Sequence, residues 1–60
     1  MNDQREYWIL CVAADGREKR VRVLAKGENA ACAKAELQAK REAPIDSRGK
    51  ASGWRVFRVM

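Results

Sequence analysis

Apolar residues gather in four segments of the chain, and their spacing predicts three strands and one helix. Residues Tyr7–Ala13 (YWILCVA) are apolar at nearly every position, which is typical of a central strand. Residues Lys19–Ala25 (KRVRVLA) alternate between apolar and basic side chains, the pattern of a strand with one buried face. Residues Trp54–Val59 (WRVFRV) predict a third, shorter strand.

The first two strands are separated by Asp15-Gly16, which predicts a hairpin with a two-residue type I′ turn. That turn would set Leu10 opposite Val21 and Trp8 opposite Val23. The core face of the sheet is then expected to carry Trp8, Leu10, Val12, Val21 and Val23. The other face would carry Tyr7, Ile9, Cys11, Leu24, Arg20 and Arg22.

Residues Glu28–Glu42 are rich in strong helix formers and predict the only helix. Gly27 can serve as its N-cap, and Pro44 ends it. At 100° per residue the helix presents one stripe of small residues that would pack closely on the sheet: Ala31, Cys32, Ala35 and Ala39. A loop, Pro44–Gly53, leads to the last strand, whose core face is expected to be Trp54 and Val56 rather than Phe57 and Val59.

Together these elements predict one α+β domain spanning residues 1–60, with residues 1–6 as a flexible tail. Its layout is ββαβ, with a three-stranded antiparallel sheet of order 2-1-3 and the helix packed on one face. The most apolar strand then lies in the middle of the sheet. The other face of the sheet has no element to cover it, so it must meet water or a partner.

Size and composition exclude most catalytic classes. A chain of 60 residues cannot enclose a large pocket beside a core, and it lacks the histidine that most catalytic dyads and many metal sites use. We therefore expect no enzyme activity, no metal and no cofactor. Cys11 and Cys32 are expected on opposite sides of the sheet, so no disulfide should join them.

Charge points to anionic partners, although it also serves solubility. The chain has 13 Lys+Arg against 8 Asp+Glu, a net charge of +5. It has neither a secretory signal core nor an apolar run near the roughly 20 residues that span a membrane. The sequence therefore predicts a cytoplasmic protein without membrane contact, either a monomer or a weak homodimer.

The uncovered sheet face is the main candidate for binding, because it interleaves arginine with aromatic residues. Such a surface suits a protein partner or stacked bases and phosphates, and a merely solvated face is the alternative. The candidate contacts are Tyr7, Arg20, Arg22, Arg55, Phe57 and Arg58. A second basic cluster, on the helix and the long loop, comprises Lys34, Lys40, Arg41, Arg48 and Lys50.

The order of these segments resembles one known family, the small host RNA polymerase inhibitors encoded by podophages. The resemblance rests on Tyr7-Trp8, on residues 21–25 followed by a helix with Ala31 and Ala35, and on residues 53–56 with Arg58-Val59. It implies a ββαβ fold, a host target and a contact at Arg58. The helix departs from the acidic helix of that family, because it carries Lys34, Lys40 and Arg41.

The sequence thus favours a small, phage-encoded binding protein that docks on a large host protein, such as RNA polymerase, and inhibits or modulates it. The alternative is a basic nucleic-acid-binding module that uses the same sheet face. Salt dependence would separate the two, because phosphate contacts release counterions.

Overall fold

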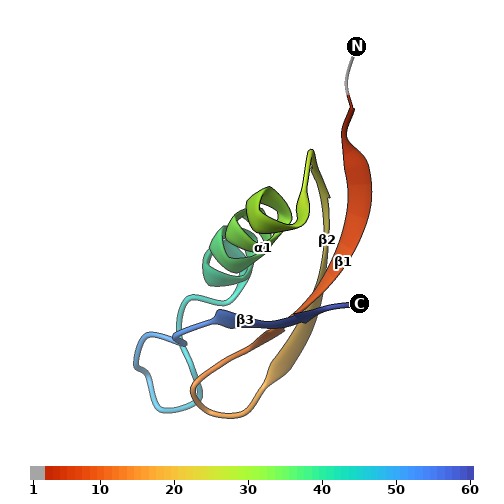
Figure 1. Cartoon of the computed structure of the whole chain (residues 1–60). Coiled ribbons are helices and arrows are strands. Elements are labelled where there is room, and N and C mark those ends of the chain that lie inside the picture. Colours follow the sequence, from red (N-terminus) through yellow and green to blue (C-terminus); the bar gives the residue numbers. More distant parts are fainter. Residues whose placement is uncertain (1–2) are drawn as a thin grey trace.

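The computed structural model describes residues 3–60, which form a three-stranded antiparallel sheet with one helix on one face (Figure 1). The elements are β1 (Arg5–Val12), β2 (Glu18–Ala25), α1 (Glu28–Glu42) and β3 (Arg55–Val59). β1 lies between β2 and β3, so the strand order is β2-β1-β3. This ββαβ arrangement confirms the α+β fold, the antiparallel sheet and the strand order expected from the sequence.

The strand ends differ slightly from those expected. Arg5 and Glu6 were predicted to lie in a flexible tail, but they open β1, where they pair with Ala25 and Leu24. Met1 and Asn2, the first residues of that predicted tail, lie outside the described residues.

The hairpin between β1 and β2 contains the main departure from expectation. Gly16 has a φ of 92°, and within residues 3–60 no residue other than glycine has a positive φ. A type I′ turn needs positive φ at both central positions, so Asp15-Gly16 does not form one. Instead Ala13 N donates to Arg17 O at 2.9 Å and Gly16 N donates to Ala13 O at 3.0 Å, which closes a three-residue loop.

The extra loop residue shifts the pairing of β1 with β2 by one position. Ile9 lies opposite Val21 and Tyr7 opposite Val23, which corrects the predicted register. A shift of one residue moves every side chain of a strand to the other face. The predicted core face of β1 (Trp8, Leu10 and Val12) is therefore wrong, and those side chains point away from α1. Ile9 and Cys11, expected on the uncovered face, are fully buried beneath the helix.

The helix packs against β1 and β2 through its small residues, as expected. Ala31, Ala35 and Ala39 are fully buried, and Cys32 lies partly buried at the edge of the core. Because alanine side chains are short, the helix axis can approach the sheet closely. On β2 the expected core residues Val21 and Val23 are buried, and so is Ala25, the next residue in the same alternation. The alternation along that strand therefore predicted its core face correctly.

A bulge in β3 resolves the ambiguity about its core face. Val56 pairs with Cys11 and Val59 pairs with Ile9, and the register shifts between them. Phe57 is the extra residue of the bulge, because it lies between Val56 and Arg58, which pair with consecutive residues of β1. Val56 and Val59 therefore both pack against the core, and Trp54 is buried with them. The preference for Trp54 and Val56 is confirmed, while Val59 joins them on the same side.

The long loop before β3 is fixed by buried polar contacts. The side chain of Asp46 is fully buried and accepts hydrogen bonds from the backbone N–H groups of Arg48 and Lys50, at 2.8 and 3.0 Å. Trp54 Nε1 donates to the carbonyl of Ala43 at 2.7 Å. The Arg17 guanidinium lies 5.4 Å from the Trp54 ring centre, which joins the loop to the hairpin turn.

Candidate binding face

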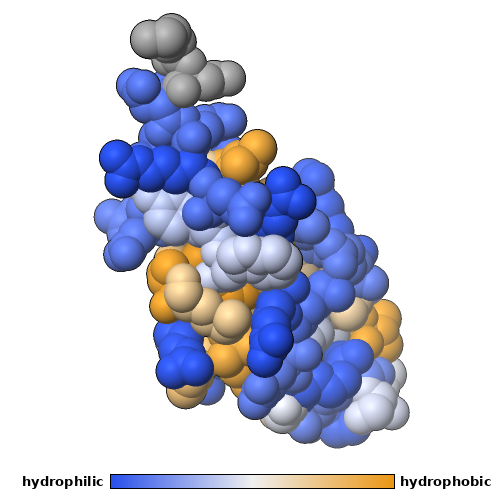
Figure 2. Space-filling model, turned by 90° about the vertical axis from the view of Figure 1, so that its right-hand side faces the viewer, coloured by the Kyte–Doolittle hydropathy of each residue, from blue (hydrophilic) through white to orange (hydrophobic). Residues whose placement is uncertain are grey.

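The side of the sheet away from α1, hereafter the open face, is built by alternate residues of all three strands. The central strand supplies apolar side chains, and the flanking strands supply most of the charged ones. The open face comprises Glu6, Trp8, Leu10 and Val12 of β1, Glu18, Arg20, Arg22 and Leu24 of β2, and Arg55, Phe57 and Arg58 of β3. Figure 2 shows this side, where hydrophobic and pale residues run between deep-blue hydrophilic ones.

Strand pairing sets the apolar residues of the central strand beside charged neighbours. Leu10 pairs with Arg20 on β2 and with Arg58 on β3, so it is flanked by arginines on both sides. Trp8 lies opposite Arg22. The result is an apolar strip along β1 between two rows of arginine.

Several apolar side chains of this face remain accessible to solvent. Trp8 is 45% exposed, Leu24 50% and Phe57 66%. Single exposed apolar residues are ordinary, but a contiguous group on one face marks an interaction site more often. The open face is not flat at the bulge. A hollow of about 270 Å³ lies beside the Phe57 ring, lined also by Val12, Glu18, Arg55 and Val56.

One of the four arginines is partly neutralised. Arg22 Nε lies 2.8 Å from Glu6 Oε2, and Trp8 Nε1 donates to Glu6 Oε1 at 3.1 Å. These two contacts orient the Trp8 ring at the end of the strip nearest the N-terminus of β1. Within residues 3–60, Arg20, Arg55 and Arg58 form no salt bridge, so their charges are available to a partner.

The sequence-predicted contact residues fall on the open face with one exception. Arg20, Arg22, Arg55, Phe57 and Arg58 lie there together. Tyr7 does not, because the register shift turns its side chain toward the helix, where it packs half-buried against the core. Sequence reasoning missed Trp8, which takes its place; interpreting Ala14-Asp15-Gly16 as a three-residue loop with glycine last would have found it.

The second basic cluster predicted from the sequence is not assembled in the structure. Lys34 and Arg41 line a groove between α1 and β2, while Lys40 pairs with Glu36 at 2.9 Å on another side of the helix. Arg48 is bound to Asp46 at 2.7 Å, and Lys50 belongs to the same loop. These five cations therefore do not form one surface.

The cysteines lie closer in the fold than expected, because Cys11 faces the helix rather than the open face. Both are free thiols. Burial raises the pKa of the Cys11 thiol, and the nearby Glu36 carboxylate and Cys32 raise it further. A raised pKa keeps the thiol protonated at neutral pH, which makes Cys11 a packing residue rather than a nucleophile.

Other kinds of site are sparse in the described part of the chain. Among residues 3–60, no three side chains of the metal-ligating types Cys, Asp and Glu are grouped where an ion could be held. In the same range, no helix has the length and apolar character needed to cross a membrane. No protein-family model matches this chain, and comparisons with curated proteins and with solved structures gave no match.

Proposed function

We propose that this protein is a small, non-enzymatic binding protein that docks its open face on a larger partner protein and thereby inhibits or modulates that partner. The observation that carries the proposal is the apolar strip of Trp8, Leu10 and Val12 between two rows of arginine. Aromatic and arginine side chains are the residues that contribute most to protein interfaces.

The chemistry of the open face favours a protein over a nucleic acid. Leu10, Val12 and Leu24 are aliphatic and offer no ring on which a base could stack. Glu6 and Glu18 lie on the same face and would repel phosphates. An apolar partner surface with an acidic rim would complement both the strip and the arginines.

The size of the face is sufficient for such a partner. A standard protein interface buries about 800 Å² on each side. That area is less than a fifth of the 4426 Å² of accessible surface that the chain exposes. A contact of standard size therefore needs only a minor part of the surface of this chain.

The kind of partner we propose is a large protein of a host cell, with a phage as the source of the chain. The resemblance to podophage inhibitors of host RNA polymerase supports this, and so does the shared ββαβ layout. Because the open face itself carries Arg20, Arg55 and Arg58, the target surface should be acidic.

The test is capture of a bacterial partner by the tagged chain, with exposed residues truncated one at a time. Trp8→Ala and Phe57→Ala each remove a ring from the open face and should weaken binding by at least about 2 kcal/mol if the ring anchors the interface. Ile45→Ala is the matched control, because Ile45 is an exposed apolar residue, 56% accessible, that lies in the loop. Circular dichroism verifies that each variant folds.

We expect one stoichiometric protein that stays bound after nuclease treatment and a high-salt wash and is lost with Trp8→Ala or Phe57→Ala. Recovery of nucleic acid alone, released by salt, would replace the proposal with a nucleic-acid-binding module. Capture that survives both ring deletions would move the binding site off the open face.

A further inference from the structure

The outer edge of β2 offers backbone hydrogen-bonding groups in an alternating pattern. The bond from Ala13 N to Arg17 O marks a hydrogen-bonded pair at the hairpin end, so Cys11–Lys19 and Ile9–Val21 are also hydrogen-bonded pairs. The residues between them therefore direct their N–H and C=O groups away from β1. On β2 these outward residues are Glu18, Arg20, Arg22 and Leu24.

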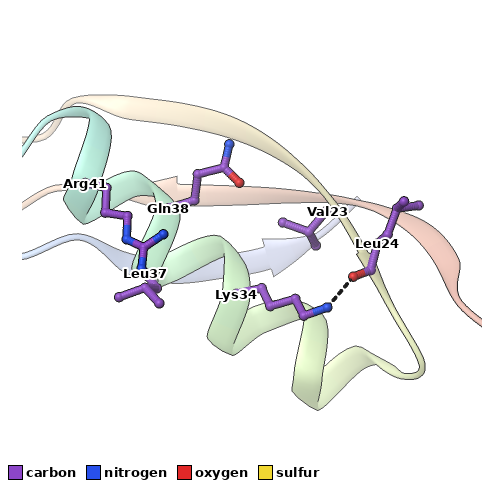
Figure 3. Close-up of a pocket in the computed structure, with 6 residues that line it drawn as sticks. All are labelled: Val23, Leu24, Lys34, Leu37, Gln38 and Arg41. Atoms are coloured by element: carbon purple, nitrogen blue, oxygen red, sulfur yellow. Dashed lines mark hydrogen bonds between the residues drawn. The ribbon is translucent and has the colours of Figure 1, made fainter.

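One contact confirms this orientation and occupies the outward backbone acceptor at one end of the edge. Lys34 of α1 donates its ammonium to the carbonyl oxygen of Leu24 at 2.7 Å (Figure 3). Among residues 3–60, no backbone hydrogen bond is found on the outward groups of Glu18, Arg20 or Arg22. Edge strands that present such groups can pair with a further strand.

A groove runs beside this edge, between β2 and α1. It has a volume of about 310 Å³, and its apolar part includes Val23, Leu24 and Leu37. Leu24 and Leu37 are 50% and 52% exposed, so the groove leaves apolar surface in water. In Figure 3 the Val23 side chain points from the strand toward the helix, and Lys34 reaches across to the strand.

The charged residues that line the groove are all basic. Its other lining residues are Lys34, Gln38 and Arg41, and no carboxylate lines it. Glu42 lies next to its far end, where it accepts a hydrogen bond from Gln38, but it is also paired with Lys19 at 2.8 Å. Arg20 and Arg22 stand along the strand edge on the open-face side, where Arg22 is also paired with Glu6 and Glu18 marks the hairpin end.

We propose that the β2 edge and the groove beside it bind an extended acidic peptide segment, which adds to the sheet as a fourth strand next to β2. Side chains of a strand alternate between the two faces of the sheet. One set of peptide side chains would enter the groove over Val23 and Leu37 and should be apolar. The other set would lie beside Arg20 and Arg22 and should be acidic.

This site differs from the apolar strip of the open face, because it uses the backbone of β2 and the flank of α1; the two share only the arginines Arg20 and Arg22. Lys34 and Arg41 add positive charge on the helix side, so acidic residues flanking the bound segment are also favoured. The ligand class that follows is an extended segment in which glutamate or aspartate alternates with leucine, isoleucine or valine.

The test uses a synthetic peptide of alternating glutamate and leucine, as long as β2, titrated into the isotopically labelled full chain. We expect slowed hydrogen exchange at the amides of Arg20 and Arg22, because their outward N–H groups become bonded. A peptide of alternating lysine and leucine is the control and should not protect them. Failure of the acidic peptide to bind at millimolar concentration overturns the proposal.

Two matched pairs of variants separate strand addition from other contacts. Arg20→Pro removes an outward N–H without breaking the bonds to β1, whereas Arg20→Ala removes only the side chain. The proline should weaken binding by about tenfold relative to the alanine, the equivalent of one backbone hydrogen bond. Arg41→Gln should weaken it by about fivefold relative to Lys40→Gln, which removes the same charge outside the groove.

The outcomes also distinguish this site from the open face. Trp8→Ala and Phe57→Ala should leave peptide binding unchanged even if they abolish capture of a partner protein. Binding that depends on these two rings, or that is equal for the proline and alanine variants at Arg20, would place the peptide elsewhere and overturn strand addition.

Discussion

Ile9 and Leu10 are neighbours in β1 whose side chains lie in opposite environments. Ile9 is fully buried between the sheet and the helix, whereas Leu10 stands half-buried on the open face between Arg20 and Arg58. Burial of apolar surface is the dominant favourable term in folding. The two residues should therefore differ sharply in what they contribute to stability, although they are nearly equal in size and hydrophobicity.

We predict that Ile9→Ala lowers the free energy of unfolding by about 2–5 kcal/mol, because it leaves a cavity in the core. Leu10→Ala should cost clearly less, since its side chain already contacts water. Urea denaturation of the two variants measures both values. A larger loss for Leu10→Ala than for Ile9→Ala would favour the two-residue turn and reject the register in which Ile9 faces the helix.

At the scale of elements, the distance between α1 and the sheet depends on alanine. Ala31, Ala35 and Ala39 are fully buried at successive turns of the helix. The last turn is followed by Pro44 and by the loop that Asp46 and Trp54 hold in place. Helix and loop therefore leave little freedom for the helix to move away from β1 and β2.

A larger side chain in this stripe should be costly. We predict that Ala35→Leu destabilises the protein by about 1–3 kcal/mol or more, because a tightly packed core has no room for the added atoms. Ala33→Leu is the matched control, since Ala33 is exposed on the same helix, and it should change stability by less than about 0.5 kcal/mol. Thermal melting followed by circular dichroism compares the two, and equal melting temperatures would contradict close helix packing.

At the scale of the whole molecule, three carboxylates couple stability to pH. Hydrogen bonds from the Arg48 side chain and the Lys50 amide lower the pKa of Asp46, and Lys19 and Gln38 lower that of Glu42. Burial by itself would raise the pKa of Asp15, but hydrogen bonds from Arg17 and Ser47 outweigh it and lower the pKa. A carboxyl with a lowered pKa in the folded state binds more protons in the unfolded chain than in the folded one. The free energy of unfolding therefore rises with pH between the lowered pKa and the ordinary pKa of that carboxyl.

We predict that the free energy of unfolding is greatest near neutral pH and falls as the pH drops through the ordinary values of 3.8 for aspartate and 4.5 for glutamate. The loss should continue down to the lowered pKa values. Asp46→Asn keeps an acceptor for the loop amides but removes the charge, so its stability should depend on pH less steeply. Urea denaturation between pH 2 and 7 measures both curves; parallel curves would show that Asp46 does not contribute to the coupling.

Much of this architecture follows from local patterns along the chain. The alternation of Val21, Val23 and Ala25 places β2 correctly, and the alanine spacing of residues 28–42 defines both the helix and the face it buries. The uncovered side of the sheet follows from counting elements, since one helix covers one face. Sequence patterns alone therefore sufficed to assign Arg20 and Arg22 to the open face, and Arg55 and Phe57 with the preferred core face of the last strand. Strict alternation would turn Arg58 to the opposite side from Arg55, and only the bulge brings both to the open face.

Only the tertiary structure decided which side of β1 is buried. That strand is apolar on both faces, so no periodicity distinguishes Ile9 from Leu10, and the register depends on whether the turn holds two residues or three. The bulge at Phe57 and the bond from Lys34 to Leu24 depend likewise on contacts between distant segments. The sequence by itself determined the elements and their order, because these follow from local spacing. Only the folded chain shows that Trp8, rather than Tyr7, lies on the open face. The groove beside β2 likewise exists only where the helix packs beside that strand.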